Sequence, residues 1–159
     1  MKKKNALTML GTLLFIALSG FKCDKPPFAE EFFPITVQNN SPDTIYADLG
    51  LGIKHPFPQF PDTILPTDKP VLMYILPYSS SYHFDFRKPQ EQIVKELAAD
   101  TLSIYIFSKS VYEDTAWSNV RSGYQVLQRY DLSLENLQRL DFKVPYPPTT
   151  EMAGMKIYP

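Results

Sequence analysis

The chain has 159 residues, of which 14% are aromatic and 15 are prolines, and its formal net charge is −1. This length is enough for one domain with its own core, and the apolar and aromatic content argues against intrinsic disorder. The chain has no excess of Lys and Arg, which argues against nucleic-acid binding.

The N-terminus has the pattern of an export signal. Three lysines, Lys2–Lys4, precede an apolar run over residues 6–18. The positive end of such a segment stays in the cytoplasm while the apolar run enters the translocon. We therefore predict a signal peptide over residues 1–22, whose removal leaves 12 basic against 17 acidic residues and a net charge near −5.

Cys23, the only cysteine in the sequence, decides whether the mature protein is tethered. A lone thiol cannot form an internal disulfide in an oxidising compartment, and its place after the apolar run favours acylation of its sulfur. Phe21 and Lys22 depart from the usual lipoprotein box before such a cysteine. A cut after Ser19 by ordinary signal peptidase, which would release a soluble protein, is the alternative.

The same interpretation sets the domain boundaries and the cellular address. An uncleaved anchor is disfavoured because the run falls short of the ~20 apolar residues of a membrane span. Residues 23–31 follow as the lipidated cysteine and a tether, residues 32–148 as one globular domain, and residues 149–159 as a C-terminal tail. We expect an exported protein of the cell envelope, held in the outer membrane by its lipid.

Strand patterns dominate the first half of the domain. Apolar and polar residues alternate over 33–38 and 44–49, and residues 81–86 have one aromatic and one polar face. Residues 71–76 are apolar on both faces, which predicts a central strand. The five prolines within 55–70 exclude an interior strand or helix there and predict a long surface loop.

The second half predicts three short helices alternating with strands. Pro89 suits the first position of a helix, and Ser133 is a good N-cap. β-branched and aromatic residues mark the strands, most strongly over 101–108. The predicted order is helix 89–98, strand 101–108, a helix from Ser110 or Asp114 to Gly123, strand 125–132, a helix after Ser133, and a strand over 142–146 confined to an edge by Pro145.

These elements predict an α+β fold. We expect a single domain with an antiparallel β-sheet of about six strands and three short helices in its second half. A β-sandwich of the immunoglobulin-like kind is the alternative.

The C-terminal part also carries a series of short motifs. Residues 100–107 (DTLSIYIF) and Trp117 are followed by 126–137 (VLQRYDLSLENL), 144–148 (VPYPP) and 155–159 (MKIYP). This series resembles a family of small envelope lipoproteins of Bacteroidetes. The resemblance implies an envelope address and lipidation, and it assigns no chemistry.

No catalytic motif stands out in the sequence. Ser81, His83 and Asp85 have the residue types of a nucleophilic triad, but side chains two apart on a strand lie about 7 Å apart, so a polar strand face is favoured. His55 is the only other histidine, which disfavours a metal site. With six glycines in all, the chain offers no phosphate cradle, and we expect no cofactor.

The aromatic side chains are the remaining candidates for a functional surface. Trp117 with Tyr112, Tyr124 and Tyr130 would form a platform for a carbohydrate or peptide. The favoured interpretation is that these side chains pack a short helix onto the sheet, with Trp117 as a core anchor.

The sequence assigns no specific activity. We expect a non-catalytic, envelope-anchored lipoprotein that presents a binding or assembly surface, with the membrane as one partner through its lipid and an unknown protein or glycan as the other. The alternatives are a small secreted hydrolase and a fimbrial or secretion-apparatus subunit whose edge strand is completed by a neighbour.

Overall fold

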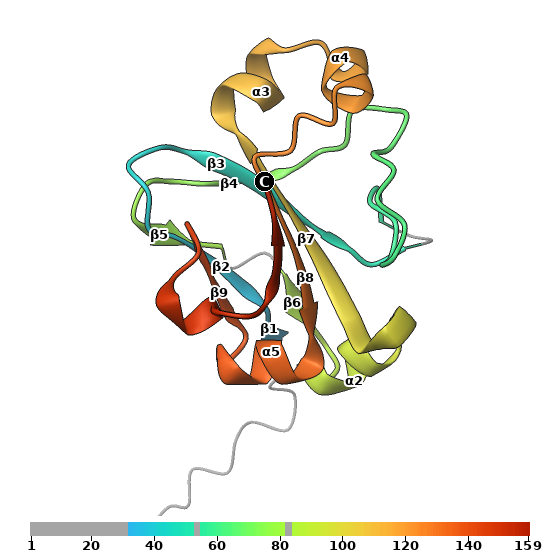
Figure 1. Cartoon of the computed structure of the whole chain (residues 1–159), viewed down its shortest axis with the longest axis vertical. Helices are drawn as coiled ribbons and strands as arrows, with labels where there is room; N and C mark the ends of the chain where they lie inside the picture. The colour runs from blue at the N-terminus through green and yellow to red at the C-terminus, as the bar shows by residue number, and fades with distance from the viewer. Residues whose placement is uncertain (1–31, 53–54, 82–83) are drawn as a thin grey trace, which may run out of the picture. The chain divides into compact units, whose positions relative to one another are not determined.

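The structure, a computed structural model, describes residues 32–52, 55–81 and 84–159 (Figure 1). Phe32–Pro159 forms one compact unit. Within the described residues it contains ten short strands and four short α-helices, which confirms the predicted α+β class. The predicted signal peptide, Cys23 and the tether lie outside the described residues.

The main sheet has five antiparallel strands in the order β10-β8-β7-β3-β4. Its middle strand, β7, is buried along almost its whole length because apolar cores pack on both of its faces. The predicted strong strand over 101–108 is therefore confirmed. The five strands are β3 (Ile45–Gly50), β4 (Met73–Ile75), β7 (Thr101–Ser108), β8 (Gln128–Ser133) and β10 (Lys156–Tyr158).

β4 occupies a different place from the predicted one. The pattern of residues 71–76 predicts a central strand, but β4 lies at the edge of the sheet with β3 as its partner. Leu72 and Ile75 are buried on opposite faces of the sheet, each in a different apolar core, and this explains why the segment is apolar on both faces. Tyr74 and Leu76 are nevertheless exposed. The prediction of a central strand is therefore wrong.

The other strands form two smaller sheets. A three-stranded sheet has the order β5-β2-β9, in which β2 and β9 run parallel, and β1 pairs with β6. The expected single sheet is thus divided into three, while the edge position of the strand with Pro145 is confirmed. The strands are β1 (Phe33–Pro34), β2 (Thr36–Asn39), β5 (Ser79–Ser80), β6 (Asp85–Phe86) and β9 (Lys143–Tyr146).

The helices lie at the two ends of the main sheet, α2 and α5 at one end and α3 and α4 at the other (Figure 1). The helix expected from Ser110 or Asp114 onward is divided by extended backbone at Thr115. Its cap is Ser108, whose Oγ accepts a hydrogen bond of 3.2 Å from the N–H of Val111. The helical segments are α2 (Gln90–Lys95), α3 (Lys109–Asp114), α4 (Trp117–Ser122), α5 (Leu134–Arg139) and the 3-10 turns η1 (Ala98–Asp100) and η2 (Thr150–Met152).

Two apolar cores lie on opposite faces of the main sheet. Ile104 and Ile106 of β7 point into the first core, which also contains residues of β2, β9, α2 and α5. Tyr105 and Phe107 point into the second core, because side chains alternate along a strand. The segment 55–70, here called the Pro-rich loop, has no helix or strand, as predicted, and contributes Phe57 and Leu65 to the second core.

Residues 149–159 belong to the folded unit. They form η2 and then β10, which pairs antiparallel with β8. Met152 and Met155 are buried in the first core. The ordered domain thus continues past residue 148, where the tail was expected to begin, because a three-residue strand gives too short a pattern to be recognised in a sequence.

Candidate functional site

Among the predicted site residues, Ser81 is one that the structure describes in full. Cys23 and His83 lie outside the described residues. Ser81 is buried, and its Oγ accepts a hydrogen bond of 2.9 Å from the N–H of Val37 in the three-stranded sheet. The Ser81 hydroxyl therefore serves as the hydrogen-bond acceptor for a backbone N–H of a buried strand.

Trp117 is buried in the second core, which confirms its predicted role as a core anchor. Its indole Nε1 donates a hydrogen bond of 2.9 Å to the carbonyl oxygen of Pro66. Tyr130 points into the first core, on the opposite face of the sheet. The alternative platform of Trp117 with Tyr112, Tyr124 and Tyr130 is therefore not formed.

A different set of tyrosines comes together at the outer end of the main sheet. Tyr46 of β3 and Tyr74 of β4 are directly opposite each other in the strand register. The ring of Tyr112 in α3 packs against that of Tyr46 with a centroid distance of 4.2 Å. Lys69 Nζ lies 4.4 Å from the Tyr112 ring centroid on the solvent side. Sequence reasoning missed this set because the pairing of β3 with β4 brings distant segments together.

Polar contacts hold these tyrosines in place. The Tyr46 hydroxyl donates a hydrogen bond to Glu113 Oε1, and this bond, with burial, raises the pKa of Tyr46 to about 12. The Tyr112 hydroxyl donates to the carbonyl oxygen of Pro70 at 2.9 Å and accepts from the N–H of Leu72 at 3.2 Å. α3 is thereby fastened to the beginning of the β4 segment.

Exposed apolar side chains cluster on and beside β4, and this segment, residues 71–78, is here called the β4 edge. The exposed fractions are 90% for Val71, 61% for Tyr74, 55% for Leu76 and 74% for Tyr78. β3 pairs with one side of β4, and among the described residues no strand pairs with the other. The β4 edge therefore combines apolar side chains with an unpaired strand.

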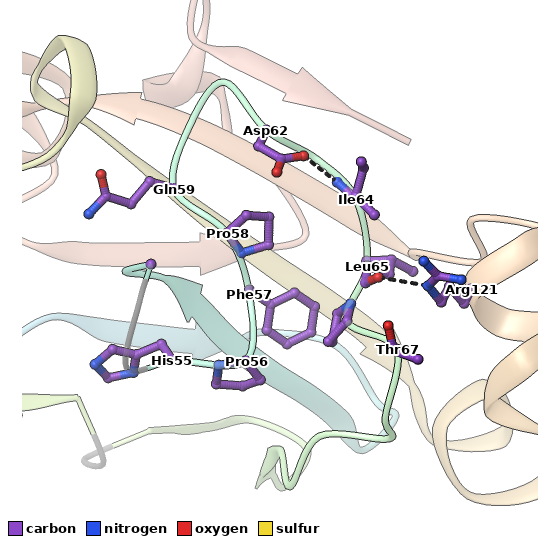
Figure 2. A pocket seen from close by; sticks show the side chains of 12 residues that line it. His55, Pro56, Phe57, Pro58, Gln59, Asp62, Ile64, Leu65, Thr67 and Arg121 are labelled. Carbon is purple, nitrogen blue, oxygen red and sulfur yellow. Dashed lines mark hydrogen bonds between the residues drawn. The ribbon is translucent and has the colours of Figure 1, made fainter.

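A cavity of about 560 Å³ lies against the Pro-rich loop (Figure 2). Figure 2 shows His55, Asp62 and Arg121 at separate points around this loop. Asp62 Oδ1 accepts a hydrogen bond from the N–H of Ile64 at 2.9 Å, and Arg121 Nε donates to the carbonyl oxygen of Leu65 at 3.0 Å. These charged groups fix the loop and do not converge on a common point.

A buried polar group beside the second core fastens β10 to the sheet. Asp131 accepts a hydrogen bond of 2.7 Å from the Ser103 hydroxyl and lies 3.2 Å from Arg129 Nη2. The guanidinium carbon of Arg129 lies 4.2 Å from the ring centroid of Tyr158 in β10. Arg129 Nη1 also donates to the Tyr124 hydroxyl at 2.8 Å. The arrangement is a structural clamp made of charge-assisted contacts.

Asp48 is a half-buried carboxyl group on β3 whose proton affinity is clearly raised. It lies on β3 opposite Tyr105, and its Oδ1 accepts a hydrogen bond of 2.7 Å from the N–H of Leu49. Burial raises the pKa of Asp48 to about 6, although the hydrogen bond from Leu49 acts in the opposite direction. Its charge is therefore costly to maintain at neutral pH.

Comparisons with protein-family models, curated proteins and solved structures find no match to this chain. No helix of the described residues has the length and apolar character needed to cross a membrane. The same part of the chain holds no group of three or more His, Cys, Asp or Glu side chains suited to a metal ion. The function is therefore argued from the surfaces above.

Proposed function

We infer that this chain is a non-catalytic envelope lipoprotein, anchored by acylated Cys23, that presents the β4 edge as an assembly surface. The observation that carries this proposal is the cluster of exposed apolar side chains on and beside a strand that is paired on one side only. Single exposed apolar residues are ordinary on protein surfaces. Several large ones within a short segment, beside a strand with one unpaired side, are typical of a site that another chain covers.

The surroundings of the β4 edge support a rigid docking surface. Tyr46 and Tyr112 pack on each other behind Tyr74, and Glu113 accepts the hydrogen bond from Tyr46. A surface held in one arrangement loses less conformational entropy on binding than a mobile one. The β4 edge is therefore built to bind without reordering.

The use of the polar side chains supports binding over hydrolysis. A hydrolase needs a nucleophile and a base within hydrogen-bond reach of each other. The Ser81 hydroxyl accepts from the Val37 N–H, and Asp62 accepts from the Ile64 N–H. Both side chains are used as hydrogen-bond acceptors for backbone N–H groups, and neither is paired with a catalytic partner.

Mass spectrometry of the mature N-terminus tests the anchor. We expect a chain that begins at Cys23 and carries acyl mass, and a Cys23→Ser variant that loses this mass and leaves the membrane fraction. An unmodified chain that begins at Gly20 would contradict lipidation.

Site-specific photo-crosslinking in cells tests the surface. A photoreactive phenylalanine analogue at Tyr74 should crosslink to protein, while the same analogue at Ile64 in the Pro-rich loop should not. Ile64 is a matched control because it is 65% exposed, against 61% for Tyr74. Equal crosslinking at the two positions would refute an assembly role for the β4 edge.

A further inference from the structure

We propose that Tyr78 is the side chain through which the β4 edge binds its partner, and that this partner is a protein with a concave apolar pocket for the Tyr78 ring. Tyr78 follows Pro77 in the turn that leads from β4 to β5. This inference rests on the proposed function, because it names the main binding residue of the same surface and the kind of partner that fits it.

The backbone of Tyr78 is left-handed, with a φ of 52°. A Cβ atom makes this conformation costly for residues other than Gly, and Asn and Asp tolerate it best among the others. Proline followed by a left-handed residue is the pattern of a type II turn, in which Gly or Asn is the usual second central residue. A tyrosine at this position therefore weakens the turn.

Tyr124 and Phe142 are also left-handed, and their side chains have contacts that offset this cost. Tyr124 has a φ of 47°, packs against the second core and accepts a hydrogen bond of 2.8 Å from Arg129 Nη1. Phe142 has a φ of 54° and is buried in the first core. The Tyr78 side chain is 74% exposed and forms no hydrogen bond or ring contact with the described residues. Backbone strain that the fold does not offset is typical of functional positions.

Polar contacts hold the turn in this conformation. Asn39 is fully buried, and its Nδ2 donates a hydrogen bond of 3.0 Å to the carbonyl oxygen of Leu76. Ser79 Oγ donates to the same oxygen at 2.9 Å. The N–H of Tyr78 donates to the carbonyl oxygen of Ser41 at 3.3 Å. The Tyr78 ring is therefore presented from a fixed backbone, which lowers the entropic cost of binding.

The partner contacts side chains of this segment, because its main chain is already engaged. The Tyr112 hydroxyl accepts from the N–H of Leu72 and donates to the carbonyl oxygen of Pro70. Asn39 Nδ2 donates to the carbonyl oxygen of Ile75 at 3.2 Å. Strand addition needs free backbone donors and acceptors, so these bonds disfavour it along the segment.

The chemistry of the segment favours a pocket on a protein. Residues 71–78 contain no charged or amide side chain, and the two tyrosine hydroxyls are their only side-chain oxygen or nitrogen atoms. A glycan needs several polar side chains to bond its hydroxyls, and an anionic membrane surface attracts Lys and Arg. Aromatic side chains buried in apolar pockets supply much of the binding energy of protein interfaces. A protein pocket therefore fits this segment better than a glycan or a membrane.

Substitution by asparagine separates binding from folding. In the mature chain from residue 23, with Cys23→Ser, Tyr78→Asn should melt at the temperature of the parent or up to about 5 °C above it, because Asn tolerates the left-handed backbone. Tyr124→Asn is the matched control and should melt below the parent, since the hydrogen bond from Arg129 is lost. Circular dichroism measures both. A Tyr78→Asn variant that melts as low as Tyr124→Asn would give Tyr78 a structural role and overturn the inference.

Photo-crosslinking from position 74 in cells measures binding. In a chain that carries the photoreactive analogue at Tyr74, Tyr78→Asn should reduce the protein adduct by about ten-fold or more, whereas Tyr78→Phe keeps the ring and should retain most of it. Ile64→Asn changes an exposed apolar residue of the Pro-rich loop and should leave the adduct unchanged. A full yield of adduct with Tyr78→Asn, or equal losses with Tyr78→Asn and Tyr78→Phe, would overturn binding of the ring in an apolar pocket.

The same experiment separates this inference from the proposed function. If the analogue at Tyr74 captures a protein and the capture needs a ring at position 78, both stand. If the capture does not depend on position 78, the role of Tyr78 fails and the assembly role remains. If nothing is captured above the level at Ile64, both fail. A Tyr78-dependent adduct whose added mass is lipid or glycan would overturn the protein partner.

Discussion

Replacement of Asp48 by asparagine should stabilise the protein at neutral pH. Asp48 is half-buried on β3, and its pKa is raised from 3.8 to about 6. Because the folded pKa lies above the unfolded one, the folded state holds the proton more tightly. The stability that this carboxyl contributes in its neutral form is complete below about pH 4 and is lost as the pH rises through about 6.

The size of the effect follows from the same values. Each factor of ten in proton affinity is worth about 1.4 kcal/mol, so the difference between the two states corresponds to at most about 3 kcal/mol. Partial exposure of Asp48 reduces this, and we expect a gain of about 1–3 kcal/mol for Asp48→Asn at pH 7. The amide oxygen that this substitution introduces can still accept the hydrogen bond from the N–H of Leu49.

Urea denaturation of the parent and of Asp48→Asn between pH 4 and pH 7 measures the effect. The two free energies of unfolding should be similar near pH 4 and should separate as the pH rises through about 6. Asp68→Asn, a change of the same charge on an exposed loop residue, is the matched control and should remain parallel to the parent. A constant difference between parent and Asp48→Asn across this range would refute the reasoning.

Three further changes test the packing. Trp117→Ala should lower the free energy of unfolding by about 3–5 kcal/mol, because the Trp117 ring packs in the second core and its hydrogen bond to the Pro66 carbonyl oxygen would be lost. A red-shifted, readily quenched tryptophan emission from the native protein would contradict the burial of Trp117. Gly50→Ala should lower the free energy of unfolding by about 1–3 kcal/mol, measured by chemical denaturation, since the added Cβ would lie 2.5 Å from the Pro58 carbonyl oxygen. An unchanged denaturation midpoint would show that the Pro-rich loop moves away without cost. Deletion of residues 156–159 removes β10, which pairs with β8, and should lower the melting temperature measured by circular dichroism. An unchanged melting temperature would mean that β10 does not contribute to stability.

Elements with a strong local pattern could be predicted from the sequence. Residues 101–108 form β7 as expected, because β-branched and aromatic side chains suit a strand that is buried on both faces. The Pro-rich loop also follows from local chemistry, since proline removes backbone donors. In both cases the residues themselves decide the conformation.

Features that depend on distant partners could not be predicted in this way. The parallel pairing of β2 with β9 joins residues near the two ends of the domain, and nothing in either segment specifies the other. The tyrosine set has the same origin, because Tyr46, Tyr74 and Tyr112 meet only after β3 pairs with β4. Nearness in sequence instead suggested a group around Trp117, but Tyr130 of β8 points into the first core, whereas Trp117 lies in the second.

The wrong expectation for residues 71–76 has a functional interpretation. Leu72 and Ile75 complete the two cores of the domain, so folding alone requires only these apolar side chains. Val71, Tyr74 and Leu76 leave apolar surface exposed to solvent, which raises the risk of aggregation. Places where local rules and the fold disagree are where function is expected. A segment that has the composition of a central strand and the position of an edge strand becomes consistent once another chain covers its exposed apolar side chains, as the proposed assembly role requires.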